Sequence, residues 1–484
     1  MKKERLFQSS IVPARRDQSS ILLGYTTRLA LALAVGLVPA RAQGQESVPP
    51  PQSMVQLVQP SATGPAGSLI TITLQDALER ARKNSAQFLA ATTDARNAHE
   101  DRVQARAALL PSVSNSTQYL GTQGNGLIPT GRFVTNDGVH VYREWAVLHQ
   151  DLSPGAFMMT GYRRASAAEA LAQAKAEVAR RGLAVTVTRA YEALVVSQRK
   201  YATAQASLDQ ARHFLEITQE GESVGQTAHS DEIKAELQFE QQKQAFEEAK
   251  LALESDRLAL AVLISPTVNE NFTVVDDLDS PRTLPPFPDV QAMAEKENAD
   301  LQAAVESLRT ARFDVAAARN ALLPSLTLDV DYGIEANAFA LRSVVSADPR
   351  FGPLPNLGYF ATAVLNVPVW DWGILRSKLH QAEYRQQQAQ VELSQTQRES
   401  VSNLYSFYNE ALVARGAVES LRHAADLATE SLRLTNLRYQ AGESTALEVV
   451  DAQNTLTQAR NAYDDAEARY RLALANLQTL TGNF

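Results

Sequence analysis

Histidine, carboxylate and glycine residues could do chemistry in this chain, but their spacing fits no catalytic pattern. No two of the seven histidines stand four positions apart, as they do on a metalloprotease helix. His140 and His149 share a strand-like segment with no carboxylate pair beside them, and the glycines lack the standard phosphate-binding spacings. Cysteine is absent, which excludes disulfides, thiolate metal sites and lipid attached through cysteine. We therefore predict no catalytic residue, no metal site and no cofactor.

The chain instead repeats itself. Residues 105–112 read Ala-Arg-Ala-Ala-Leu-Leu-Pro-Ser, and residues 318–325 match them at seven of eight positions. Each copy ends a helical pattern at a proline, Pro111 or Pro324, and proline disfavours helical geometry in the residue before it. Two further equivalent positions, Gly225 and Gly442, interrupt long helical patterns. The duplication predicts one architectural unit used twice.

Each half is predicted to contain a helix, two strands, a very long helix and a shorter helix. In the first half these elements are expected at 74–110, 112–121, 139–152, 154–219 and 230–266. In the second half they are expected at 290–323, 325–335, 359–370, 373–440 and 445–480.

The predicted domain order begins with a segment that is removed on export. Residues 1–42 have basic residues, an apolar run and an Ala-Arg-Ala end, which is typical of a signal peptide. A flexible linker at 43–69 precedes the first repeat (70–266), an inter-repeat linker (267–289) and the second repeat (290–484). Loss of seven basic and two acidic residues changes the net charge from −8 to −13. Such an acidic protein is not expected to bind nucleic acid.

The helical segments are too long for an ordinary globular domain. A helix of about 65 residues spans roughly 100 Å. The last helix has a seam with alternating steps of three and four residues, as in a coiled coil. Its members are Val449, Ala452, Leu456, Ala459, Tyr463, Ala466, Tyr470, Ala473, Leu477 and Leu480.

The strand segments alternate between apolar and polar residues. In 325–335, the apolar face has Leu326, Leu328, Val330, Tyr332 and Ile334, and the other face is polar. Residues 359–369 carry a second apolar face, whereas the first-half strands alternate less clearly, with Val113 and Tyr119 on one face and Val141, Trp145 and Val147 on another. This pattern is typical of a strand with one face to lipid, and also of a half-buried soluble sheet. In lipid, four strands cannot leave open edges, so several chains would have to share one barrel.

These features resemble the TolC family of outer-membrane efflux proteins. The resemblance rests on the tandem unit, the two Leu-Leu-Pro-Ser junctions at Pro111 and Pro324, and the segment from Tyr439 to Asp451, and it covers 70–482. It implies an α+β membrane protein: a homotrimer with a shared 12-stranded outer-membrane β-barrel and a long periplasmic α-helical barrel. It also implies an exit duct for a tripartite efflux pump or type I secretion system, in outer-membrane lipid, with a periplasmic adaptor (membrane fusion protein) and an inner-membrane transporter as partners.

The resemblance also implies a periplasmic gate near the tip turns at Gly225 and Gly442. Glu448 and Asp451 fall at the positions of the family's acidic ring, and their spacing of three places them on one helix face. In a trimer, six carboxylates would surround one aperture, favour cations and raise the pKa of some members through repulsion.

Two closed-state latch positions follow from the same resemblance. Tyr439 matches a tyrosine that bonds an acidic residue of the first-half tip, and Asp231 matches that acidic partner. The family's second latch uses an arginine, whereas here Ser444 stands at the arginine position and Ser230 opposite it. Two other readings remain open: a soluble periplasmic coiled-coil adaptor, and a structural protein that forms filaments.

Overall fold

The computed structural model describes residues 70–121, 140–225, 228–266, 270–336, 339–342, 350 and 355–482. The predicted signal peptide (1–42) and flexible linker (43–69) lie outside the described residues, as does Val139 of the second predicted strand.

In the part of the chain that the structure describes, the first repeat contains five helices and two long strands. One of the helices, α4, is a single turn that leads into α5. Its elements are α2 (Leu74–Asn84), α3 (Ala86–Ala107), β2 (Ser112–Gly121), β3 (His140–Asp151), α4 (Pro154–Phe157), α5 (Thr160–Ser223) and α6 (His229–Ile264). The second repeat contains α7 (Phe287–Glu297), α8 (Ala299–Asn320), β5 (Ser325–Ala336), β6 (Leu357–Asn366), α9 (Ile374–Gln440) and α10 (Ala446–Thr481).

The first helix of each repeat is broken, where the sequence predicted one continuous helix. Ser85 is extended (φ −71°, ψ 112°) and its side chain accepts a hydrogen bond from the Phe88 backbone N–H. Asn298 is extended (φ −68°, ψ 111°) and caps α8 in the same way through the Leu301 N–H. Short polar side chains of this kind satisfy the free N–H groups of a new helix start. The break is therefore part of the duplicated unit.

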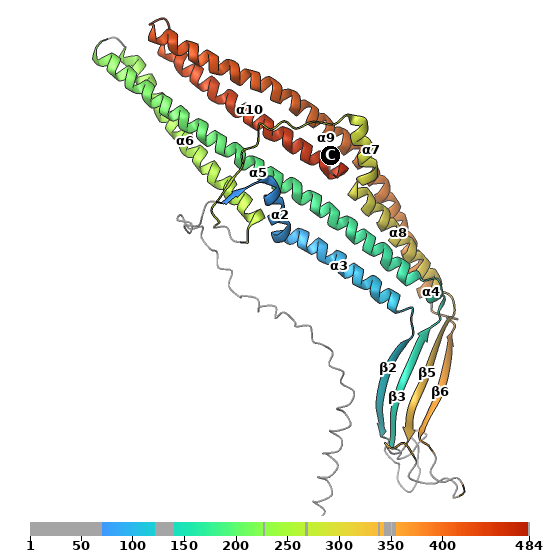
Figure 1. Ribbon diagram of the computed structural model, residues 1–484. Helices are drawn as coiled ribbons and strands as arrows, with labels where there is room; N and C mark the ends of the chain where they lie inside the picture. Colours follow the sequence, from blue (N-terminus) through green and yellow to red (C-terminus); the bar gives the residue numbers. More distant parts are fainter. Residues whose placement is uncertain are drawn as a thin grey trace, which may run out of the picture. The chain divides into compact units, whose positions relative to one another are not determined.

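Four strands form one antiparallel sheet in the order β2-β3-β5-β6 (Figure 1). In each repeat the first strand of the sheet begins directly after the junction proline. β2 begins at Ser112 after Pro111, and β5 begins at Ser325 after Pro324. The fourth strand was predicted to reach residue 370, which is wrong, because β6 ends at Asn366. Pro368 has no N–H to continue the ladder.

The register of the sheet separates an apolar face from a polar one. Leu328, Val330 and Tyr332 of β5 stand opposite Ala363, Ala361 and Tyr359 of β6. On β3, this face carries Tyr142, Ala146 and Leu148 together with the polar residues Glu144 and Gln150. Trp145 and Val147 lie on the polar face, opposite Gly333 and Asp331.

Cross-strand polar pairs occupy that second face. Arg143 forms an ion pair with Glu335 at 2.8 Å, and His149 approaches Asp329 at 2.6 Å. Trp145 packs edge-on against Phe360, with ring centroids 5.1 Å apart. One face of the sheet is thus rich in charge, while the opposite face exposes large apolar side chains such as Tyr359 and Leu365.

The long helices pair as two hairpins, α5 with α6 and α9 with α10, which lie side by side in Figure 1. Eight of the ten predicted seam positions of α10 are buried, and Ala459 and Tyr463 are half-buried. Four of the ten seam positions are alanine, which lets helix backbones approach closely. No helix in the described ranges combines the length and the apolar character that crossing a bilayer requires.

A second, parallel strand pair joins the start of the first repeat to the segment between the repeats. β1 (Ile70–Ile72) pairs with β4 (Phe272–Val274), and both pack on α5 near Tyr191. The Tyr191 hydroxyl donates to the backbone carbonyls of Val275 and Ile72. The segment predicted only as an inter-repeat linker (267–289) therefore contains a strand and part of the hydrophobic core.

Candidate functional site

The two tip turns share the same backbone conformation at a glycine. Gly225 and Gly442 have φ values of +76° and +75°, a region that favours glycine, and each follows the end of a long helix. Gly225 N–H donates to Glu222 O at 2.8 Å, and Gly442 N–H donates to Tyr439 O at 3.0 Å. Both turns lie at the same end of the paired helices in Figure 1. The 64 residues of α5 place this end about 96 Å along the helix from the sheet.

At the second tip turn, Glu448 forms hydrogen bonds with the two residues that directly precede α10. The Ser444 hydroxyl donates to Glu448 Oε2 at 2.7 Å, and the Glu448 N–H donates to the Thr445 hydroxyl at 3.4 Å. The hydrogen bond from Ser444 contributes most to lowering the pKa of Glu448. Arg438 lies 3.7 Å away. Asp451, three residues further on, is exposed.

The structure brings Tyr439 and Asp231 near each other without a bond. Burial raises the pKa of Tyr439, and the negative charge of Asp231 raises it further. The Asp231 carboxylate accepts instead from Lys234 Nζ at 3.1 Å. Within the described residues, Ser444 bonds Glu448 and no hydrogen bond joins it to Ser230.

Apolar packing connects the two tips. Tyr439 lies against Phe214, with ring centroids 5.3 Å apart, and the same cluster includes Ala235, Ala446 and Val449. Two amides of α6 add polar contacts, because Gln238 and Gln242 both donate to Asn454 of α10, at 3.0 and 3.2 Å.

The first tip has a group of ligand-type side chains that the sequence reading overlooked. His229 Nδ1 lies 2.7 Å from Glu222 Oε1 and 3.1 Å from Glu232 Oε2. Hydrogen bonds to Glu222 and then to Glu232 raise the pKa of His229. The available signal was a histidine three residues before one glutamate, with a second glutamate across the glycine turn.

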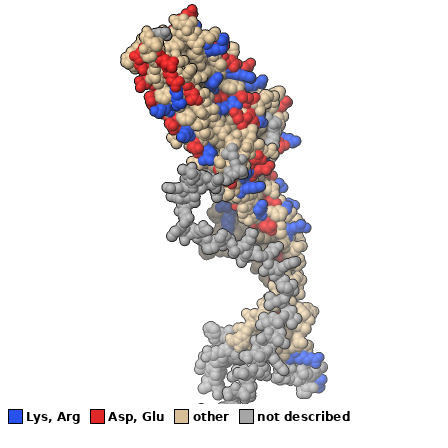
Figure 2. Space-filling view, turned by 60° about the vertical axis from the view of Figure 1, so that its left-hand side comes forward, with Lys and Arg blue, Asp and Glu red and all other residues tan. Residues whose placement is uncertain are grey.

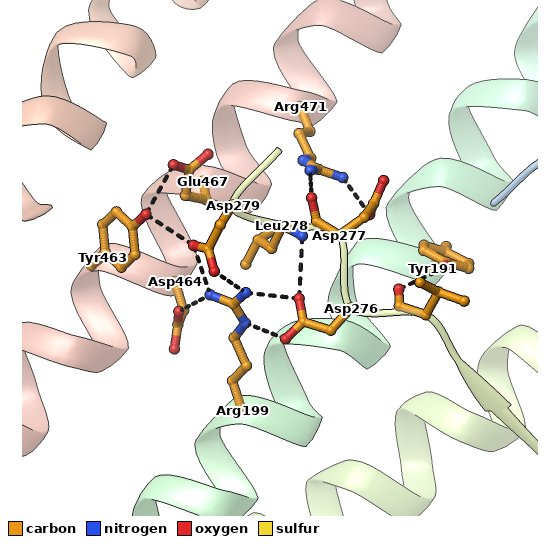
Figure 3. A network of polar contacts seen from close by, with 11 residues as sticks. Tyr191, Arg199, Asp276, Asp277, Leu278, Asp279, Tyr463, Asp464, Glu467 and Arg471 are labelled. Atoms are coloured by element: carbon orange, nitrogen blue, oxygen red, sulfur yellow. Dashed lines mark hydrogen bonds and ion pairs between the residues drawn. The ribbon is translucent and has the colours of Figure 1, made fainter. Parts of the chain in front are cut away.

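A larger polar network, also missed from the sequence, lies near the β1–β4 pair. We call it the band; it joins α5, α10 and the segment after β4 (Figure 3). Arg199 forms ion pairs with Asp276 at 2.6 Å, Asp279 at 2.8 Å and Asp464 at 3.1 Å. The Tyr463 hydroxyl donates to Asp279 at 3.1 Å.

The second half of the band centres on Arg471, whose side chain is 4% exposed. It contacts Glu192, 3% exposed, at 3.3 Å and Asp277 at 2.7 Å, and it donates to the Asp277 carbonyl. Burial raises the pKa of Glu192. Buried charges of this kind must stay paired, because an unpaired charge in the interior is costly.

The charges of the outer surface are mixed and exposed. Figure 2 shows acidic and basic side chains interspersed over the helices on one face.

Comparison with known proteins matches both the sequence and the fold. The outer membrane efflux protein family profile matches residues 291–483. The pyoverdine export outer membrane protein OpmQ of Pseudomonas aeruginosa is 28% identical over 427 residues, 84% of this chain and 83% of that protein. The outer membrane protein TolC of Vibrio cholerae is 24% identical over 412 residues, 84% of this chain and 90% of that protein.

The solved CmeC outer membrane channel of Campylobacter jejuni has the same fold, with a TM-score of 0.71 and 17% identity over 84% of this chain and 85% of that channel. The agreement in fold therefore extends over parts of both repeats. With its duplicated helix–strand–strand–helix unit, the chain is similar in sequence and in fold to the outer-membrane efflux proteins of the TolC family.

Proposed function

We propose that this protein is a passive exit duct, built from three copies, that crosses the outer membrane and is gated at its periplasmic helix tips. The observation that carries the proposal is a four-stranded sheet with an apolar face and two unpaired edges, continued by helices about 100 Å long.

The open edges argue for assembly. β2 and β6 are the outer strands, and every residue of both is exposed. In lipid, the N–H and C=O groups of an edge need partners, so the β6 edge of one copy would pair with the β2 edge of the next. Three copies would close a barrel of twelve strands, an even number within the range of such barrels.

The orientation of the sheet follows from its two faces. The face with Tyr332 and Tyr359 would contact lipid, and the face with Arg143 and Asp329 would line a water-filled interior. The helices would continue this path as a tunnel through the periplasm. Transport would be passive, with energy supplied by an inner-membrane transporter, and no enzymatic step is involved.

The tips would form the gate. Glu448 and Asp451 of three copies would surround one aperture and favour cations, while the contact between Tyr439 and the first tip would hold it closed. A periplasmic adaptor would dock in the helix grooves near 215–235 and 433–455 and separate the tips. The cargo would pass outward in an efflux pump or a type I secretion system.

Disulfide crosslinking tests the assembly, because the chain has no cysteine of its own. Single cysteines on the polar face of β2 (Ser114→Cys, Ser116→Cys) are combined with Thr362→Cys or Asn366→Cys on β6. Oxidation of isolated outer membranes should give dimers and trimers on a non-reducing gel.

The matched control links two strands of one chain. Asp329 and Thr362 stand opposite each other in β5 and β6, so the pair Asp329→Cys with Thr362→Cys should form no species larger than the monomer. Recovery of the protein in periplasmic extract, with no β2–β6 crosslink at any pair, contradicts the duct and supports a soluble adaptor.

A further inference from the structure

Three metal-ligating side chains meet at the first tip, on opposite sides of its turn. Glu222 belongs to the last turn of α5, and His229 and Glu232 belong to the first turn of α6. Their ligand atoms all lie within 4.8 Å of one another. We infer that Glu222, His229 and Glu232 form a binding site for a divalent transition-metal ion, with Zn²⁺ as the reference ion, that clamps α5 to α6.

The distances fit such an ion after a small adjustment. Zn²⁺ binds histidine nitrogen and carboxylate oxygen at about 2.0–2.1 Å, so two ligands in a tetrahedral site lie about 3.3 Å apart. His229 Nδ1 is now 2.7 Å from Glu222 and 3.1 Å from Glu232, the spacing of hydrogen bonds. Replacing the shared proton with the ion requires the ligand atoms to separate by a few tenths of an ångström.

The chemistry of the ligands selects the class of ion. One imidazole nitrogen and two carboxylate oxygens suit Zn²⁺ and neighbouring transition metals, whereas Ca²⁺ and Mg²⁺ take oxygen ligands. The His229 side chain is 70% exposed, so water can fill the remaining coordination position. Lys234, on the same helix turn, is paired with Asp231 at 3.1 Å.

The duplication shows that the fold does not require this group. The residues 217 positions later are Tyr439, Ala446 and Val449, and they form the apolar contact between the tips. The first tip thus has three ionisable side chains where its copy has packed ones. Since the three are at the surface, replacing them removes ligands without opening the core. The inference does not depend on the proposed duct.

Metal binding by the purified full-length protein in detergent, without an affinity tag that binds metal, tests the site. After treatment with a chelator, Zn²⁺ is titrated by calorimetry, and Co²⁺ is followed by its visible absorption, which reports coordination geometry. We expect one ion per chain, and an affinity at least tenfold lower for His229→Ala and for Glu232→Gln.

The control is a histidine with the same local spacing. His213 stands three residues before Glu216 at 3.8 Å, is 74% exposed, and belongs to no such group of three in the described residues. His213→Ala should bind Zn²⁺ as the unaltered protein does. Absence of binding by the unaltered protein, or equal affinity in His229→Ala, overturns the site.

Discussion

The band and the tips use charge in opposite ways. In the band, Arg471 and Glu192 are 4% and 3% exposed and are surrounded by partners from three separate segments. At the tips, the side chain of Glu448 is 47% exposed and that of Lys234 is 47% exposed. Buried pairs are costly to break, whereas exposed pairs contribute little. The difference suggests a fixed region and a region that can rearrange.

The origin of the contacts supports this division. Arg199 and Arg471 join residues 77 to 279 positions away, so the band cannot open without breaking contacts between distant segments. The contacts of the charged tip side chains Glu448 and Asp231 are local, to Ser444 and Lys234. The tips could therefore separate by losing the cluster around Phe214 and Tyr439 and the amide contacts to Asn454, while each turn keeps its own caps.

The largest effect is expected in the band. Arg471→Ala leaves Glu192 buried without its main partner and should lower the free energy of unfolding by about 3–5 kcal/mol. Thermal unfolding followed by circular dichroism measures this change. The control Arg469→Ala breaks an exposed pair with Glu410 and should leave the free energy of unfolding nearly unchanged. Equal losses in the two variants contradict the special role of the band.

A smaller effect is expected from the contact between the tips. Phe214 is 6% exposed, and Phe214→Ala should remove up to about 3 kcal/mol of packing, much of it from that contact. Single-channel conductance in planar bilayers should rise. Phe246→Ala, which removes a ring packed against Tyr201 within the first hairpin, should leave conductance unchanged. A rise in both variants would assign the effect to general loosening of the helices.

The smallest effect is a shift in pH dependence at the second tip. The Ser444 hydroxyl is the main cause that lowers the pKa of Glu448, so the stabilisation is present above the ordinary pKa of 4.5 and is lost as pH falls through the lower folded value. Ser444→Ala should therefore move the acid loss of cation selectivity to higher pH. Ser223→Ala, whose hydroxyl donates to Glu220 O, should not. If cation selectivity is lost at the same pH in Ser444→Ala, the Ser444 hydroxyl does not control the protonation of Glu448.

Periodic features were predictable from the sequence. The α10 seam and the alternation in β5 repeat with the period of a helix or strand, so each is visible locally, and the two Leu-Leu-Pro-Ser junctions are visible as near-identical copies. The faces of β3 were harder, because Trp145 and Val147 are apolar residues on the polar face. The broken first helices depended on single residues, Ser85 and Asn298, whose capping role competes with helix continuation.

The band and the group at His229 could not be derived in this way. The contact between Arg471 and Asp277 joins positions 194 residues apart, and the acidic segment 276–279 has no periodicity. At the tips, the sequence placed Tyr439 near Asp231, but it could not show that Lys234 occupies the carboxylate or that Ser444 turns back to Glu448. Such partner choices depend on the three-dimensional position of each side chain.

The central claim is that the tips open while the band stays fixed, and one pair of matched variants tests it. Tyr439→Ala removes a ring that packs between the two tips, and Tyr463→Ala removes a tyrosine that bonds Asp279 in the band. Conductance of single channels in planar bilayers should rise for the tip variant and stay at the unaltered value for the band variant. Unchanged conductance in the tip variant, or an equal rise in both, contradicts the account.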